Sequence, residues 1–84
     1  MLRFRLIVIT GRHLRAARAL IGWSQDELAA KAKVALRTIT RVEGYDDAVS
    51  GRLGTLNRIV AVLEKAGVEF LDDGQPGVRL KKRS

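Results

Sequence analysis

The first residues of the chain alternate between apolar and basic side chains. Leu2, Phe4 and Leu6 alternate with arginines, and a β-branched run follows. This pattern predicts a strand over residues 2–9 that ends at Gly11. No second strand follows directly in the sequence, so we expect the strand to pair with a distant segment or with another copy of the chain.

A first helix is predicted over residues 12–21, because apolar side chains recur there at the spacing of one helix face. These side chains are Leu14, Ala17 and Ile21. Gly22 follows where a left-handed C-cap is needed. Trp23 comes next, and we expect it to be buried between this helix and a later one.

Two further short helices are predicted before residue 45. Ser24 and Glu27 form a Ser-x-x-Glu capping box, which indicates the start of the second helix. Its buried side consists of Leu28, Ala29 and Ala32. The helical pattern breaks at residues 33–34 and resumes on a third helix that Gly44 closes. The buried residues expected on that helix are Ile39 and Val42.

The last part of the chain predicts a helix followed by a hairpin. Thr55 is expected to cap a fourth helix, which ends at Gly67. Its apolar face consists of Leu56, Ile59, Val60 and Leu63. Residues 68–71 and 77–80 are short extended runs, and the turn-forming residues 72–76 separate them.

Composition narrows the possible functions. The 84 residues suffice for one domain, and 46% hydrophobic with only 5% aromatic residues indicates an aliphatic, helical core. The net charge is +7, and residues 1–23 contain arginines but no acidic residue, which favours a polyanionic partner.

The sequence contains few of the residues that metal binding or nucleophilic catalysis requires. The chain has no cysteine, and His13 is its single histidine. We therefore expect neither an enzyme nor a cofactor or metal site. No apolar run is long enough to span a bilayer and no targeting signal is evident, so we expect a cytoplasmic protein without a membrane partner.

Residues 25–44, QDELAAKAKVALRTITRVEG, resemble the helix-turn-helix of the lambda-repressor and Cro-like proteins, also called the XRE family. The resemblance extends over roughly residues 12–80. It implies a mainly α, four- to five-helix DNA-binding domain, here with a small β element formed by the N-terminal strand and the C-terminal hairpin. The expected parts are an extension (1–11), the helix-turn-helix domain (12–67), a hairpin (68–80) and a basic tail (81–84).

The resemblance also implies which residues contact DNA. Gln25 would lie against a phosphate at the amino end of the second helix, although a second capping residue is an alternative. Leu36, Arg37 and Arg41 would face the major groove, where an Arg fork can pair with guanine. Leu36 could equally be a partly buried core residue. The other residues assigned to the DNA contact are Lys33 in the turn and, near the sugar-phosphate rim, Thr38 and Thr40.

The sequence departs from the family pattern at two positions. Lys33 stands where the family usually has Gly with a positive φ, at a cost of roughly 1 kcal/mol. Ala35 stands where the family usually has a capping Ser or Thr, and losing such a cap costs about 1 kcal/mol. Arg18 and Glu43 match positions that form an internal ion pair in some members. A solvated Glu43 is the alternative.

The function expected from these observations is a transcriptional regulator that binds double-stranded DNA as a homodimer. Such dimers place paired helices in successive major grooves about 34 Å apart. The alternative is an antitoxin-like interaction module, which neutralises a toxin partner through its strand or hairpin and regulates its own promoter.

Overall fold

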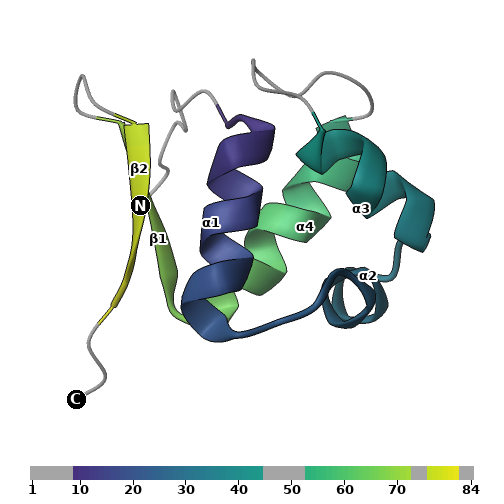
Figure 1. The fold of residues 1–84 in the computed structure, drawn as a ribbon, viewed down its shortest axis with the longest axis horizontal. Helices are drawn as coiled ribbons and strands as arrows, with labels where there is room; N and C mark the ends of the chain where they lie inside the picture. Colours follow the sequence, from purple (N-terminus) through teal and green to yellow (C-terminus); the bar gives the residue numbers. More distant parts are fainter. Residues whose placement is uncertain (1–8, 45–52, 73–75, 82–84) are drawn as a thin grey trace.

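The computed structural model describes residues 9–44, 53–72 and 76–81. Four helices and a two-stranded antiparallel sheet make up this part of the chain (Figure 1). In chain order they are α1 (Gly11–Ile21), α2 (Gln25–Ala32), α3 (Leu36–Glu43), α4 (Leu53–Lys65), β1 (Val68–Asp72) and β2 (Pro76–Leu80). The expectation of a mainly α fold with a C-terminal hairpin is confirmed. The strand predicted over residues 2–9 lies outside the described residues, except for Ile9.

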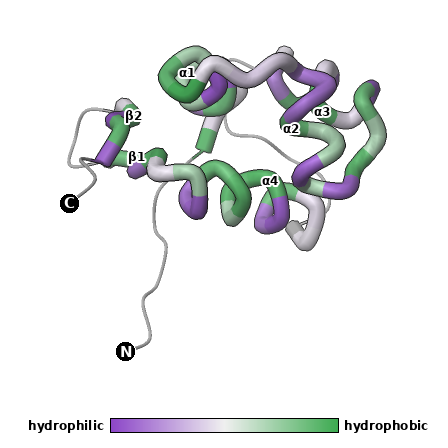
Figure 2. The backbone as a smooth tube through the Cα atoms, turned by 90° about the horizontal axis from the view of Figure 1, so that it is seen from below, coloured by the Kyte–Doolittle hydropathy of each residue, from purple (hydrophilic) through white to green (hydrophobic). Residues whose placement is uncertain are grey.

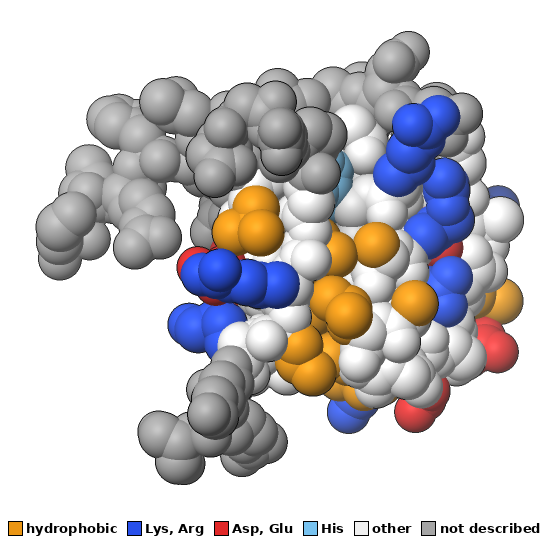
Figure 3. Space-filling view, turned by 60° about the vertical axis from the view of Figure 1, so that its left-hand side comes forward, with side chains coloured by type: hydrophobic (Ala, Val, Ile, Leu, Met, Phe, Trp, Pro, Cys, Tyr) orange, Lys and Arg blue, Asp and Glu red, His pale blue; other side chains and the backbone are white. Residues whose placement is uncertain are grey.

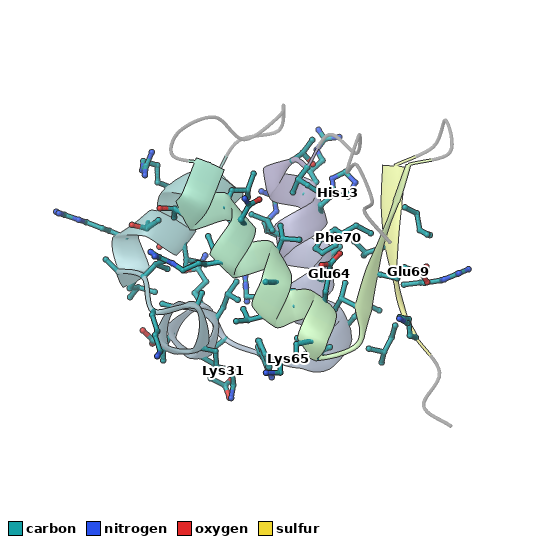
Figure 4. All side chains as sticks on the ribbon, turned by 180° about the vertical axis from the view of Figure 1, so that it is seen from behind. His13, Lys31, Glu64, Lys65, Glu69 and Phe70 are labelled. Atoms are coloured by element: carbon teal, nitrogen blue, oxygen red, sulfur yellow. The ribbon has the colours of Figure 1, made fainter. Side chains whose placement is uncertain are left out.

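Helix α1 begins at Gly11, one residue earlier than predicted, and a capping box fixes its start. The Thr10 hydroxyl accepts a hydrogen bond from the His13 amide, and His13 Nδ1 accepts one from the Thr10 amide at 3.0 Å. Because Nδ1 accepts a backbone N–H, the imidazole carries its proton on Nε2. The His13 ring is buried and directed toward Phe70 of β1, with ring centroids 6.2 Å apart (Figure 4).

The ends of α1 and α2 follow the sequence signals. Gly22 caps α1 in the left-handed conformation with φ 74°. Ser24 and Glu27 form the predicted capping box of α2, with the Ser24 hydroxyl accepting from the Glu27 amide and the Glu27 carboxylate accepting from the Ser24 amide. The predicted turn residue Lys33 ends α2 with φ 59° and ψ 48°.

The core is built from one face of every helix together with β1. Its largest fully buried side chains are Leu14, Leu28, Ile39, Ile59, Leu63 and Val68. Along α4, hydrophilic stretches recur at intervals between hydrophobic ones, which is the pattern of an amphipathic helix (Figure 2). Burying these aliphatic side chains stabilises the domain by roughly 1.5–3 kcal/mol for each one before entropy is subtracted.

The hairpin packs beside α1, at the end of the molecule away from α2 and α3 (Figure 1). Its register pairs Val68 with Leu80 and Phe70 with Val78. This register places Val68 and Phe70 on the core side, where both are buried.

Two sequence expectations were wrong. Thr55 does not cap α4, because the helix begins at Leu53 and already includes Thr55. Trp23 is not buried between two helices. It is half-buried at the edge of the core, and Lys31 Nζ of α2 lies 5.2 Å from the centre of its ring. The amphipathic indole therefore covers the core while one side of the ring faces a cation.

Candidate nucleic-acid interface

Helices α2 and α3 form a compact pair joined by residues 33–35. Small residues Ala29 and Ala32 are buried in α2, which packs against both α3 and α4. The turn is closed by backbone bonds, because the Val34 amide donates to the Ala29 carbonyl at 3.0 Å and the Lys33 amide donates to Ala30. A left-handed residue at Lys33 redirects the chain after α2, which is the geometry that a helix-turn-helix needs.

The two faces of α3 differ sharply in exposure. Ile39, Val42 and Glu43 are buried. Leu36, Arg37, Thr40 and Arg41 are exposed on the opposite side, and Thr38 is intermediate. The exposed fraction of Leu36 is 44% and it is not among the partly buried side chains packed against the core, so the alternative of a partly buried core residue is wrong. Helix α3 therefore presents two arginines, a threonine and a leucine to solvent on one continuous stripe.

A buried ion pair ties α3 to α1. Arg18 Nε donates to Glu43 Oε2 at 2.7 Å, and Arg18 Nη2 donates to Glu43 Oε1 at 2.9 Å. The Glu43 side chain is only 2% exposed, so the alternative of a solvated Glu43 is wrong. The hydrogen bond from Arg18 to Glu43 raises the pKa of the guanidinium, against a smaller opposing effect of burial. The remaining Nη1 of Arg18 donates to the Trp23 carbonyl at 3.0 Å.

Gln25 joins the same network from α2. Its Nε2 donates to Glu43 Oε1 at 3.0 Å, and its Oε1 accepts from the Thr40 hydroxyl at 3.3 Å. The Gln25 side chain is not a second cap of α2, because the capping box is formed by Ser24 and Glu27. One amide thus bridges two α3 residues three positions apart, on the side of α3 that meets α2.

Arg15 also holds the end of α3, through a hydrogen bond from its Nη1 to the Glu43 carbonyl oxygen. This role and the two bonds of Gln25 were not predicted. The partners are separated by 28, 18 and 15 residues, and only the packing of three helices brings them together. An Arg near the last carbonyls of a helix is a favourable C-terminal partner, but nothing in the sequence pairs residue 15 with α3.

The first turns of α2 and α3 differ in charge. Asp26 and Glu27 stand in the first turn of α2, next to Gln25. Helix α3 has no acidic residue in its first turn, and Ala35 gives its amides no side-chain cap, as predicted. Lys33 is exposed in the turn between them. The positive charge of the pair is therefore concentrated on α3 and on the turn, rather than on the start of α2.

The part of the chain that the structure describes holds no group of three or more His, Cys, Asp or Glu side chains arranged to bind a metal ion. Over the same residues, each helix is too short or too polar to cross a membrane. A comparison with models of known protein families gave no match, and a comparison with curated proteins gave none either.

Proposed function

We propose that the chain is a sequence-specific, double-stranded DNA-binding regulator that reads an operator with α3. The observation that carries the proposal is the two-faced α3. Its inner face is buried and anchored by Glu43, and its outer face exposes Leu36, Arg37, Thr40 and Arg41. A rigidly held helix with exposed arginines fits the width of the major groove.

The exposed residues have complementary tasks in this proposal. Arg37 and Arg41 lie four positions apart on the outer face, where a guanidinium fork can donate to O6 and N7 of guanine. Leu36 at the start of α3 would contact a thymine methyl group. Lys33 would neutralise a phosphate from the turn, and Thr38, at the edge of the exposed stripe, would lie near the sugar-phosphate backbone.

Gln25 retains a place in this scheme, although its amide is partly engaged. A side-chain amide has two N–H donors, and the bond to Glu43 uses one of them. The second N–H is available for a phosphate oxygen. Asp26 beside it opposes a close approach of phosphate, so we assign most of the backbone affinity to Lys33 and the arginines instead.

Selection from random double-stranded DNA with the full chain tests the proposal. We expect a defined consensus, and affinity for it should fall with rising salt along a log-log slope of about −0.9 for each phosphate neutralised. A pool without any enriched sequence, or binding that ignores salt, would contradict the proposal.

A homodimer is part of the same proposal, because two copies can place two α3 helices on a palindromic operator. The hairpin end is the surface that supports it. Leu20 of α1 and Leu80 of β2 are 42% and 49% exposed. Hydrophobic side chains form a band on this side of the molecule, with Lys and Arg side chains on both flanks (Figure 3). The same band supports the second candidate, an antitoxin-like contact with a partner protein. Purifying the chain with and without a co-expressed partner distinguishes a homodimer from an antitoxin-like complex.

A further inference from the structure

We propose that Thr40 contacts DNA as a hydrogen-bond acceptor and reads the exocyclic amino group of an adenine or a cytosine at one operator position. The inference rests on the proposed DNA-binding function and gives one α3 residue a chemical preference. It starts from the direction of the hydrogen bonds around Gln25.

The orientation of the Gln25 amide is set by its neighbour Glu43. A carboxylate only accepts hydrogen bonds, and Arg18 already donates to both of its oxygens. The Gln25 atom that lies 3.0 Å from Glu43 Oε1 must therefore be the NH2 group. The amide oxygen then faces Thr40, whose hydroxyl lies 3.3 Å away. Because an amide oxygen only accepts, Thr40 is the donor of this bond.

Thr40 has one hydroxyl proton, and among the described residues its two hydrogen-bond partners are both acceptors. Besides Gln25 Oε1, the Leu36 carbonyl oxygen lies 3.3 Å from the hydroxyl. Whichever of the two takes the proton, the proton points into the protein. The lone pairs of Oγ1 are left for an outside partner, and the Thr40 side chain is exposed.

The DNA groups that fit such an acceptor are few. Phosphate oxygens only accept, so a phosphate contact would require the Thr40 proton to leave both internal acceptors. In the major groove the donors are N6 of adenine and N4 of cytosine. Thr40 stands one turn after Leu36 and next to Arg41 on the exposed stripe, so it shares the surface that we assign to base contacts.

Selection of operators with Thr40→Val, Thr40→Ser and the wild type tests the inference. Val keeps the shape and removes the acceptor, whereas Ser keeps the hydroxyl. We expect Thr40→Val to lose the preference for an amino-bearing base at one position and to bind the wild-type operator roughly two- to tenfold more weakly. Thr40→Ser should keep the preference. Thr55→Val, the same change on α4 and outside the proposed DNA contact, is the control and should also keep it.

A second measurement separates a direct contact from a shift of the helix. At the position identified, an analogue that lacks the amino group replaces the adenine or cytosine. Wild type should lose roughly two- to tenfold in affinity, while Thr40→Val should lose almost nothing further. Additive losses would overturn the inference. The inference would also be overturned if replacing an operator phosphate by methylphosphonate lowers the affinity of wild type but not that of Thr40→Val. That result would place Thr40 on a phosphate. If the wild type enriches no sequence, the proposed DNA-binding function itself is contradicted. If the wild type selects a clear operator and Thr40→Val selects the same one, only this inference is contradicted.

Discussion

Arg18 and Glu43 lie 25 residues apart in the sequence and meet through two hydrogen bonds of 2.7 and 2.9 Å inside the domain. Removing one partner of a buried pair leaves a charge without its counterion, which costs much more than losing a pair on the surface. We therefore expect a mutation in this buried pair to lower the stability of the domain more than a mutation in a surface pair does.

Arg18→Met should destabilise the domain by about 3 kcal/mol, because the Glu43 carboxylate stays 2% exposed without its guanidinium. Urea unfolding measures this change. Arg79→Met is the matched control. Arg79 also pairs with a carboxylate at 2.7 Å, that of Glu69, but these side chains are 64% and 38% exposed, so we expect less than about 1 kcal/mol. Equal losses in the two variants would show that burial does not matter here.

The pH dependence of the Arg18 contribution follows from the direction of its shift. Its pKa is raised by the hydrogen bonds to Glu43, so the folded state holds the proton more tightly than the unfolded state does. The contribution is complete below the unfolded pKa and is lost only as pH rises through the folded value. The stability difference between wild type and Arg18→Met should therefore not decline from neutral to moderately alkaline pH, and a decline over that range would contradict the shift.

Arg37→Ala and Arg41→Ala should change DNA discrimination more than folding. Both side chains are exposed on α3, and each good bidentate base contact contributes about 1–3 kcal/mol of discrimination. Competition between the selected operator and a scrambled one measures it, with thermal unfolding recorded in parallel. Arg79→Ala, on the hairpin away from α3, carries the same loss of charge and should leave the operator preference intact. An unchanged preference in both α3 variants would place base recognition elsewhere.

Lys33→Gly should raise stability and lower DNA affinity at the same time. Lys33 adopts φ 59°, and relieving a left-handed side chain gains roughly 1 kcal/mol. The exposed charge is lost in the same step, so the salt slope should shrink by about 0.9 if Lys33 neutralises one phosphate. Lys33→Asn, which tolerates this conformation without the charge, should reproduce the weaker binding. A salt slope that stays unchanged in both variants would remove Lys33 from the interface.

Deletion of residues 1–8 tests the predicted N-terminal strand without damaging α1. It keeps Ile9, which is buried, and Thr10, which caps α1. If the strand joins two copies through the hairpin, the truncated chain should become monomeric in light scattering and bind the operator more weakly. A truncated chain that remains dimeric with unchanged affinity would exclude the strand from the interface.

Local signals in the sequence predicted much of the fold. Gly22, the Ser24–Glu27 box and the turn at Lys33 each depend on neighbouring residues alone, and each was predicted correctly. The Thr10–His13 box escaped prediction because His replaces the usual Glu or Gln at its third position. Thr55 failed as a cap because α4 starts before it.

The anchoring of α3 could be predicted only in part. The pair of Arg18 and Glu43 came from a resemblance between sequences, and the structure confirms it. The bonds of Gln25 and Arg15 depend on how three helices are placed relative to one another. Polar side chains on a predicted helix have many possible partners, and periodicity does not choose among them.

Because α1 anchors α3, residues 25–44 cannot simply be transferred to another protein. A graft of residues 25–44 onto another scaffold would carry Gln25 and Glu43 but leave behind Arg15 and Arg18, which hold the end of α3. The transplanted helix would then bring a carboxylate into a new interior without a counterion. A portable version of this unit has to include α1, or the host has to supply a guanidinium at the same place.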